Sequence, residues 1–211
     1  MMKMNLPNRL TVLRLCLVPV LLVVGMLPDS IIPFYLSCFI CAVLFIGTAV
    51  TDMLDGKIAR RDNLITDFGK FMDPIADKFM VIGALFVILH KFENLRTIMI
   101  FVLLVVVFRE LAVTSMRLVV STGQNIVVAA NMLGKIKTVS QIVAISTVFL
   151  EPVVQRVLYL VLEGISGRPI YGWRTDIIPL TYLSLAFAAF MTVWSGLNYI
   201  KAYWKYLDPE K

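Results

Sequence analysis

The sequence is poor in charge, in histidine and in cysteine. Charged side chains make up 16% of its 211 residues, with one His and three Cys. Ordinary soluble domains carry about 25% charged residues, so this shortage argues against most soluble enzymes. Cys16, Cys38 and Cys41 lie in apolar stretches and lack zinc-ligand spacing to His90. The pattern excludes a disulfide-rich secreted domain and predicts cysteines that pack as small apolar side chains.

Apolar residues are abundant instead. They form 59% of the chain, and the mean hydropathy is +0.85, which excludes a disordered chain. A membrane-spanning helix needs about 20 apolar residues. The sequence has six candidate runs, at about Leu10–Leu27, Ile31–Val50, Phe71–Leu89, Ile98–Val120, from Lys137 until the run weakens at Glu151, and Ile177–Ile200. We therefore predict an all-α polytopic membrane protein, a six-transmembrane-helix bundle forming one domain over residues 1–211.

Residues 151–176 depart from this simple layout. Arg156 and Glu163 interrupt the apolar stretch Val153–Ile165, and they share one helix face with Tyr159. Two interpretations stay open: an interfacial helix on the outer side, or an extension of the fifth run followed by an elaborated outer loop.

The net charge of +6 fits a membrane surface better than nucleic acid, since basic residues flank spans on the cytoplasmic side and contact anionic lipids. An even number of spans puts both termini on one side. If that side is the cytoplasm, 15 of the 20 Lys and Arg residues fall inside. The segment before Leu10 is too short for a transit peptide. We therefore predict the bacterial plasma (inner) membrane, both termini cytoplasmic, and an active site facing the cytoplasm.

Four aspartates between the second and third runs carry the strongest chemical indication. Asp52 and Asp55 are three residues apart, and Asp73 and Asp77 are four apart, so each pair shares one face of a helix. Four converging carboxylates repel one another unless hard divalent cations bind between them. The pattern thus predicts a site for two ions suited to phosphoryl transfer. The alternatives are a merely solvated charged loop and the ion path of a cation transporter.

Small residues accompany these aspartates. Gly56 and Gly69 let a ligand or another helix approach closely, and Ala59 keeps the face beyond Asp55 open. Arg60 is placed to meet a phosphate. On the first helix, Asn8, Thr11 and Arg14 share one flank; we expect them to contact a nucleotide or pyrophosphate, the alternative being a turn that binds lipid head groups.

Basic residues deep in the fourth and fifth runs predict a second site. Arg109 and Arg117 lie in the inner half of the fourth run, and Lys135 and Lys137 open the fifth. Ionisable residues at such depth normally face a bundle interior or a wet cavity, and a cationic pocket suits a ligand that carries phosphate. The alternatives are interfacial anchoring and, for Arg109, a structural ion pair.

The aspartate segment resembles the signature of the CDP-alcohol phosphatidyltransferases, D-x2-D-G-x2-A-R-x8-G-x3-D-x3-D, with every fixed position matched from Asp52 to Asp77. The resemblance implies transfer of a phosphatidyl group from a CDP-linked lipid to an alcohol, release of CMP, and a need for Mg²⁺ or Mn²⁺. It also implies roles for the aspartates: Asp52, Asp55 and Asp73 as metal ligands, with Asp73 counted as catalytic. Asp77 is implied as the general base and a further metal contact.

The motif Gly134-Lys135-x-Lys137-Thr138-x2-Gln141 resembles the branch of this family that makes phosphatidylglycerol phosphate, as do Glu110, Ser195, Gly196 and Tyr199. The donor is then CDP-diacylglycerol and the acceptor sn-glycerol 3-phosphate. The implied acceptor-binding residues are Arg109, Arg117, Lys135, Lys137, Thr138 and Gln141. The implied CDP and pyrophosphate contacts are Asn8, Thr11, Arg14, Gly56, Ala59, Arg60 and Gly69. The family also implies a homodimer.

Two alternatives remain beside this function. The first is another acceptor within the same family, such as phosphatidylglycerol in a cardiolipin synthase. The second is a different class of protein, a cation transporter or a lipid-binding scaffold without turnover.

Overall fold

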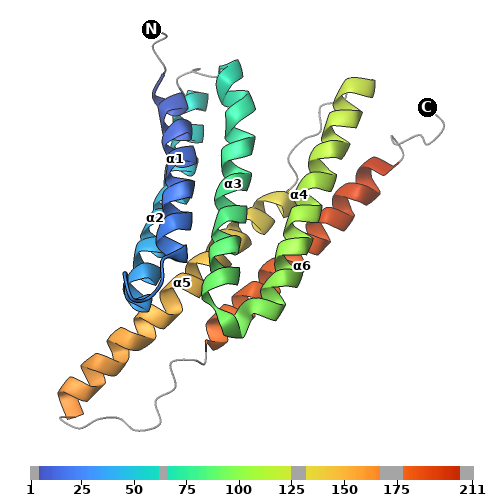
Figure 1. Ribbon diagram of the computed structural model, residues 1–211. Helices are drawn as coiled ribbons and strands as arrows, with labels where there is room; N and C mark the ends of the chain where they lie inside the picture. Colours follow the sequence, from blue (N-terminus) through green and yellow to red (C-terminus); the bar gives the residue numbers. More distant parts are fainter. Residues whose placement is uncertain (1–4, 62–65, 125–131, 167–177, 205–211) are drawn as a thin grey trace.

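The computed structural model describes residues 5–61, 66–124, 132–166 and 178–204, and these are helical with short connections and no strand. The elements are α1 (Leu6–Met26), α2 (Phe34–Arg61), α3 (Asp67–Lys91), the 3₁₀ turn η1 (Glu93–Leu95), α4 (Arg96–Gln124), α5 (Met132–Ser166) and α6 (Pro179–Tyr203). The all-α prediction of six long helices is confirmed. The first turn of α1 and the last turn of α6 lie at the same end of the bundle (Figure 1).

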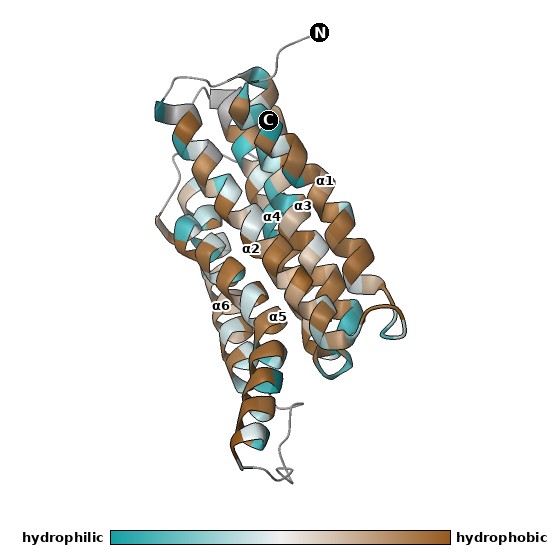
Figure 2. Ribbon diagram, turned by 90° about the vertical axis from the view of Figure 1, so that its left-hand side faces the viewer, coloured by the Kyte–Doolittle hydropathy of each residue, from teal (hydrophilic) through white to brown (hydrophobic). Residues whose placement is uncertain are grey.

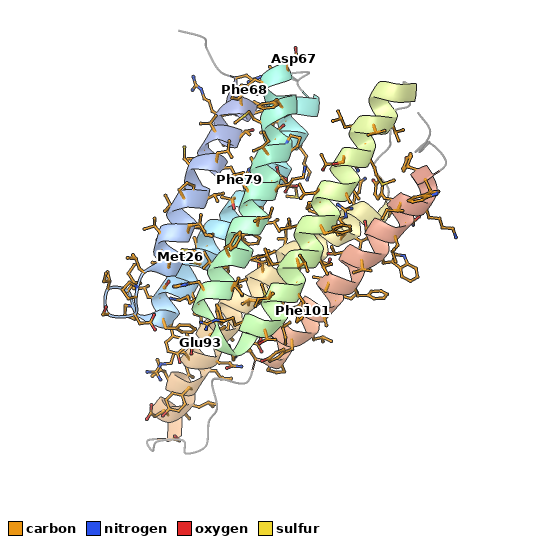
Figure 3. All side chains as sticks on the ribbon, turned by 45° about the vertical axis from the view of Figure 1, so that its right-hand side comes forward. Met26, Asp67, Phe68, Phe79, Glu93 and Phe101 are labelled. Carbon is orange, nitrogen blue, oxygen red and sulfur yellow. The ribbon has the colours of Figure 1, made fainter. Side chains whose placement is uncertain are left out.

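The outside of the bundle is apolar. Of the described helices, five are long and apolar enough to cross a membrane; α3 has 25 residues but carries acidic and basic side chains in its first half. Figure 2 shows hydrophobic residues along the middle of the helices and hydrophilic ones concentrated near their ends. Phe79 and Phe101, labelled in Figure 3, are 60% and 64% exposed. Such surfaces are stable in lipid, so the chain is a multi-pass membrane protein.

Local signals set where the helices begin. The Asn5 side chain accepts a hydrogen bond from the amide of Asn8 and so caps α1, which extends beyond the predicted apolar run. Thr66 caps α3 in the same way through the amide of Gly69. At the start of α6, the Glu151 carboxylate on α5 accepts hydrogen bonds from the backbone amides of Leu180 and Thr181, at 3.1 and 2.7 Å. The caps satisfy backbone donors that the first turn of a helix leaves unpaired.

Two glycines let α1 lie close against α3. A Cβ atom added to Gly25 would sit 2.2 Å from Val87 Cγ1, and one added to Gly83 would sit 2.9 Å from Val18 Cγ1. At either position a larger side chain would force the facing valine, or the helix that carries it, to shift. The close contact thus involves α3, the helix that carries Asp73 and Asp77.

The interior has an apolar half and a polar half. Buried apolar side chains such as Phe45, Ile88 and Phe149 fill the end near η1. Towards the opposite end, where α3 begins, the buried side chains include Thr11, Arg14, Lys137 and Ser195. Figure 3 labels Asp67 at the polar end and Glu93 at the other, so α3 connects the two halves. A polar interior at one end of a membrane bundle marks the place for a site.

The fifth run continues beyond Glu151 without a break. Helix α5 has 35 residues and includes Pro152, and its length of about 52 Å exceeds the ~30 Å hydrocarbon core. Its second half extends past the rest of the bundle at the lower left of Figure 1. Of the two interpretations of this stretch, the structure shows an extension of the fifth helix as far as Ser166; the predicted outer loop after it lies outside the described residues.

Candidate active site

A cavity of about 570 Å³ opens in the polar half of the bundle. Five helices contribute to it: the end of α2, the first half of α3, the second half of α4, the start of α5 and the end of α6. Its described lining residues are Asp52, Asp73, Pro74, Asp77, Lys78, Arg109, Glu110, Val113, Thr114, Arg117, Gly134, Lys135, Lys137, Thr138, Val139 and Tyr199. Predicted acidic and basic sites, distant in sequence, therefore share one cavity.

The acidic residues of this cavity are held from α1. Arg14 donates to Asp52 at 2.5 Å, and its side chain is fully buried whereas that of Asp52 is 44% exposed. Thr11 donates to Asp73 at 2.7 Å. Both carboxylates thus keep a fixed position while remaining open to the cavity, as a site that binds ligands from water requires.

Asn8 and Gly69 lie behind these carboxylates, where α1 packs against the start of α3. Thr66 donates to the side-chain oxygen of Asn8 at 3.0 Å, and a Cβ atom on Gly69 would come within 3.1 Å of that same oxygen. Asn8 and Gly69 are both buried. Gly69 therefore allows the close approach of α1 to α3, which brings Thr11 to Asp73.

The donor set suits a hard divalent cation. Three carboxylates from two helices, Asp52, Asp73 and Asp77, line one cavity, and carboxylate oxygens are the ligands that Mg²⁺ and Mn²⁺ prefer. Among the described side chains, no three acidic, His or Cys residues stand close enough to form a ready metal-binding group. The side chain of Asp55, the fourth predicted ligand, lies outside the described part of the chain, as do those of Ala59 and Arg60.

The basic residues come mostly from α4 and α5. Glu110 accepts hydrogen bonds from both Arg109, at 3.2 Å, and Lys137. Arg109 also donates to Ser195 of α6 at 2.9 Å. Because Arg109, Glu110 and Lys137 are only 11%, 15% and 6% exposed in their side chains, this network is held rigidly. The structural ion pair considered for Arg109 is present, and it lines the cavity as well.

Tyr199 contacts Arg117, the second arginine that α4 contributes to the cavity. Arg117 donates to the Tyr199 hydroxyl at 2.7 Å, and its guanidinium carbon lies 5.1 Å from the centre of the same ring. Arg109 approaches that ring at 5.8 Å. A guanidinium stacked on an aromatic ring keeps its outward N–H groups free to bind an anion.

Most predicted acceptor residues meet here, with one exception. Arg109, Arg117, Lys135, Lys137 and Thr138 all line the cavity. Gln141 is not among its described lining residues: it is buried one turn deeper and donates to Thr192 of α6 at 3.1 Å. Gln141 thus contacts α6 and also lines a small pocket next to the cavity, together with Asp77, Glu110, Lys137 and Thr138. Gly56 is half-buried on α2 and is likewise not among the lining residues.

Sequence reasoning assigned no binding or catalytic role to Glu110, Ser195 or Tyr199, and it connected all three to the site only through the family resemblance. All three contact the predicted basic residues. The available signal was position: Ser195 and Tyr199 are four residues apart on one face of an apolar run, and Glu110 is an isolated acid deep in another.

Comparisons with known proteins agree with this geometry. The chain matches the family model for CDP-alcohol phosphatidyltransferase over residues 4–194. It therefore belongs to the CDP-alcohol phosphatidyltransferase family.

Relatives of similar length share one name, CDP-diacylglycerol–glycerol-3-phosphate 3-phosphatidyltransferase. The chain is 39% identical to that of Bacillus subtilis (strain 168), covering 96% of this chain and 97% of the relative. It is 34% identical to the protein of Rickettsia felis over the same shares. Against that of Yersinia enterocolitica, identity is 30% over 99% of this chain and 100% of the relative.

Proposed function

We propose that this protein transfers the phosphatidyl group of CDP-diacylglycerol to sn-glycerol 3-phosphate, giving phosphatidylglycerol phosphate and CMP. The observation that carries the proposal is the single cavity that joins aspartates of α2 and α3 to basic residues of α4 and α5. The names of the relatives supply the donor and the acceptor. The cavity chemistry agrees, because a reaction between two phosphate-bearing substrates needs two anion sites side by side.

The acceptor is bound by the basic residues. The phosphate of glycerol 3-phosphate pairs with Arg109, Arg117, Lys135 and Lys137, with Thr138 as a further donor. The Glu110 and Tyr199 contacts hold the cations in place before the substrate arrives, so less ordering is needed on binding. Gln141 supports this wall from below through Thr192.

Asp77 acts as the general base. It accepts the proton of the acceptor hydroxyl while that oxygen attacks the phosphorus attached to diacylglycerol. A new phosphorus–oxygen bond forms as the bond to CMP breaks, and CMP departs with the bonding electrons. Asp73 and the basic residues of α4 and α5 position the substrates so that the reacting atoms come together.

In this proposal, Asp52, Asp55, Asp73 and Asp77 would hold two Mg²⁺ or Mn²⁺ ions. When bound, they neutralise the pyrophosphate and the departing CMP. Among the predicted CDP contacts, the proposal keeps Gly56, Ala59 and Arg60. The buried residues Asn8, Thr11, Arg14 and Gly69 act behind the carboxylates, where Thr11 and Arg14 keep Asp73 and Asp52 in position.

The proposal includes a place and an assembly. The chain is one domain over residues 1–211 in a bacterial plasma membrane, with both termini and the cavity on the cytoplasmic side and anionic lipids around its basic inner face. It works as a homodimer, as the family resemblance implies. The cavity lies at the end of the bundle that holds the first turn of α1 and the last turn of α6, so one sidedness measurement tests termini and cavity together.

Release of CMP by the purified protein tests the function. We expect release only when CDP-diacylglycerol, glycerol 3-phosphate and Mg²⁺ or Mn²⁺ are all present in mixed micelles. Release with phosphatidylglycerol in place of glycerol 3-phosphate would instead indicate a cardiolipin synthase. Absence of release with any alcohol would reject the enzyme and leave the transporter or the scaffold.

A further inference from the structure

An apolar groove runs between α4 and α6 on the outer surface of the bundle. It has a volume of about 370 Å³, and its walls include Phe108, Ala112, Val193, Gly196 and Leu197. Side chains along it are open to the surroundings: Phe108 is 68% exposed and Leu197 61%. The groove is therefore accessible from the lipid side of the bundle.

This groove and the polar cavity share a wall. Arg109 and Val113 line both. The aliphatic stem of Arg109 crosses α6 at Gly196, where an added Cβ atom would lie 3.2 Å from Arg109 Cγ. Its guanidinium ends in the polar network with Glu110 and Ser195. One side chain thus presents its charged head to the cavity and its hydrocarbon stem to the groove.

The groove has the direction and length of a lipid tail. Its α4 wall runs from Leu104 to Val113, a rise of about 13 Å along the helix. Half of a ~30 Å hydrocarbon core is close to that value. The groove begins beside the cavity and runs along the helices, across the bilayer.

We propose that the α4–α6 groove binds an acyl chain of the lipid donor while the donor's head group lies in the cavity. The inference rests on the proposed function, since it names where that donor's tail goes. A polar cavity and an apolar groove that lie on either side of Arg109 and Val113 match the order of an amphiphile, head and then tail. Gly196 has no side chain, which leaves space for the Arg109 stem between the cavity and the groove.

A second groove provides the control. It lies between α5 and α6, has a volume of about 330 Å³, and shares Lys135 and Val139 with the cavity. It is the smaller of the two grooves, and its described lining residues include no glycine at the junction with the cavity. We assign the donor tail to the α4–α6 groove alone.

Matched valine-to-tryptophan variants test the assignment. Val193 in the α4–α6 groove and Val143 in the α5–α6 groove are 45% and 53% exposed. We expect Val193→Trp to lower kcat/KM for CDP-dioleoylglycerol about tenfold, the loss expected when roughly two methylene groups are shut out of an apolar site. With CDP-dihexanoylglycerol its kcat/KM stays within about twofold of wild type, because the short chains do not reach along the groove. Val143→Trp leaves both values unchanged.

Each other outcome contradicts the assignment. Equal losses with both donors mean a structural or assembly defect, which the elution volume of the variant also reveals. No loss with either donor means that the tail lies elsewhere, and a selective loss in Val143→Trp places it in the α5–α6 groove.

A binding measurement independent of turnover completes the test. A benzophenone amino acid at position 193 should crosslink to tail-labelled CDP-diacylglycerol, and excess unlabelled CDP-diacylglycerol should abolish the crosslink while phosphatidylcholine does not. Equal competition by both lipids would overturn the groove assignment. Absence of CMP release by the wild type, with the crosslink intact, would reject the proposed function and not the groove.

Discussion

In the proposed mechanism, the chemistry depends most on Asp77. It lies on α3 in the cavity that also holds the basic residues of α4 and α5. Asp52 and Asp73 each have a hydrogen-bonded partner on α1. Asp52 and Asp73, held in place by α1, suit the role of metal ligands in the proposal, and Asp77 suits the role of the carboxylate that takes up a proton.

We predict that Asp77→Asn abolishes turnover but retains nucleotide binding. The amide cannot accept the proton of the attacking hydroxyl, and loss of a general base costs about 10²–10⁴-fold in rate. CMP release measures the rate, and calorimetric titration with CDP measures binding. Glu93→Gln, at the exposed far end of the bundle, serves as the control and should behave as wild type. Normal turnover in Asp77→Asn would show that another group takes the proton.

Glu110 is the buried counter-charge of Arg109 and Lys137, two of the basic residues that line the cavity. We predict that Glu110→Gln and Lys137→Met each lower the free energy of unfolding, because each leaves a buried partner without its counter-charge. The double variant should lose less than the sum of the two single losses, by about 1–3 kcal/mol. Denaturant titration in detergent provides all four values. Strict additivity would mean that the two side chains do not interact.

At the scale of the helices, packing of α1 against α3 positions the acidic half of the site. Thr11 approaches Asp73 only if α1 keeps its close contact with α3. Gly25 and Gly83 permit that contact. Helix packing far from the cavity therefore controls the geometry within it.

We predict that Gly25→Ala destabilises the protein by about 1–3 kcal/mol, since the new methyl group overlaps Val87. Gly47→Ala is the matched control, because nothing lies within 4 Å of a Cβ atom there. In that exposed helical position alanine should be neutral or stabilise by up to about 1 kcal/mol. Thermal unfolding in detergent compares them, and equal stability of the two variants would contradict the packing account.

The helices were predictable from sequence because lipid demands long apolar runs and satisfied backbone groups. Their ends were not, since polar residues continue each helix beyond its run. Helix α1 begins at Leu6, four residues before the predicted run, because Asn5 caps it.

The site was predictable where its residues follow helical spacing, as the aspartates do. Contacts between helices were beyond that reasoning: Arg14 meets Asp52 across 38 positions and Lys137 meets Glu110 across 27. Gln141 shows the same limit. Its face of α5 was predictable, but whether the cavity or Thr192 lies opposite depends on the packing of α6.

At the scale of the whole molecule, one end of the bundle is an apolar core and the other a polar cavity. Substrates of opposite character meet at such a boundary: a lipid donor from the bilayer and a soluble acceptor from water. The orientation of the cavity then decides which pool of glycerol phosphate the enzyme uses.

We predict that the cavity faces the cytoplasm. In a background without Cys16, Cys38 and Cys41, a membrane-impermeant maleimide should label Lys57→Cys in inverted membrane vesicles and not in intact cells. Glu93→Cys, at the other end of the bundle, should show the opposite pattern. Reversed labelling would place the cavity outside and contradict the proposed source of the acceptor.

The most direct test follows the acceptor oxygen. Purified protein would receive CDP-diacylglycerol and sn-glycerol 3-phosphate that carries ¹⁸O in both hydroxyl groups, and mass spectrometry would examine both products. The account predicts phosphatidylglycerol phosphate that retains both heavy atoms and CMP that contains neither, because the acceptor oxygen attacks the lipid phosphorus. Heavy oxygen in CMP, or a lipid product without the labelled glycerol, would contradict phosphatidyl transfer to this acceptor.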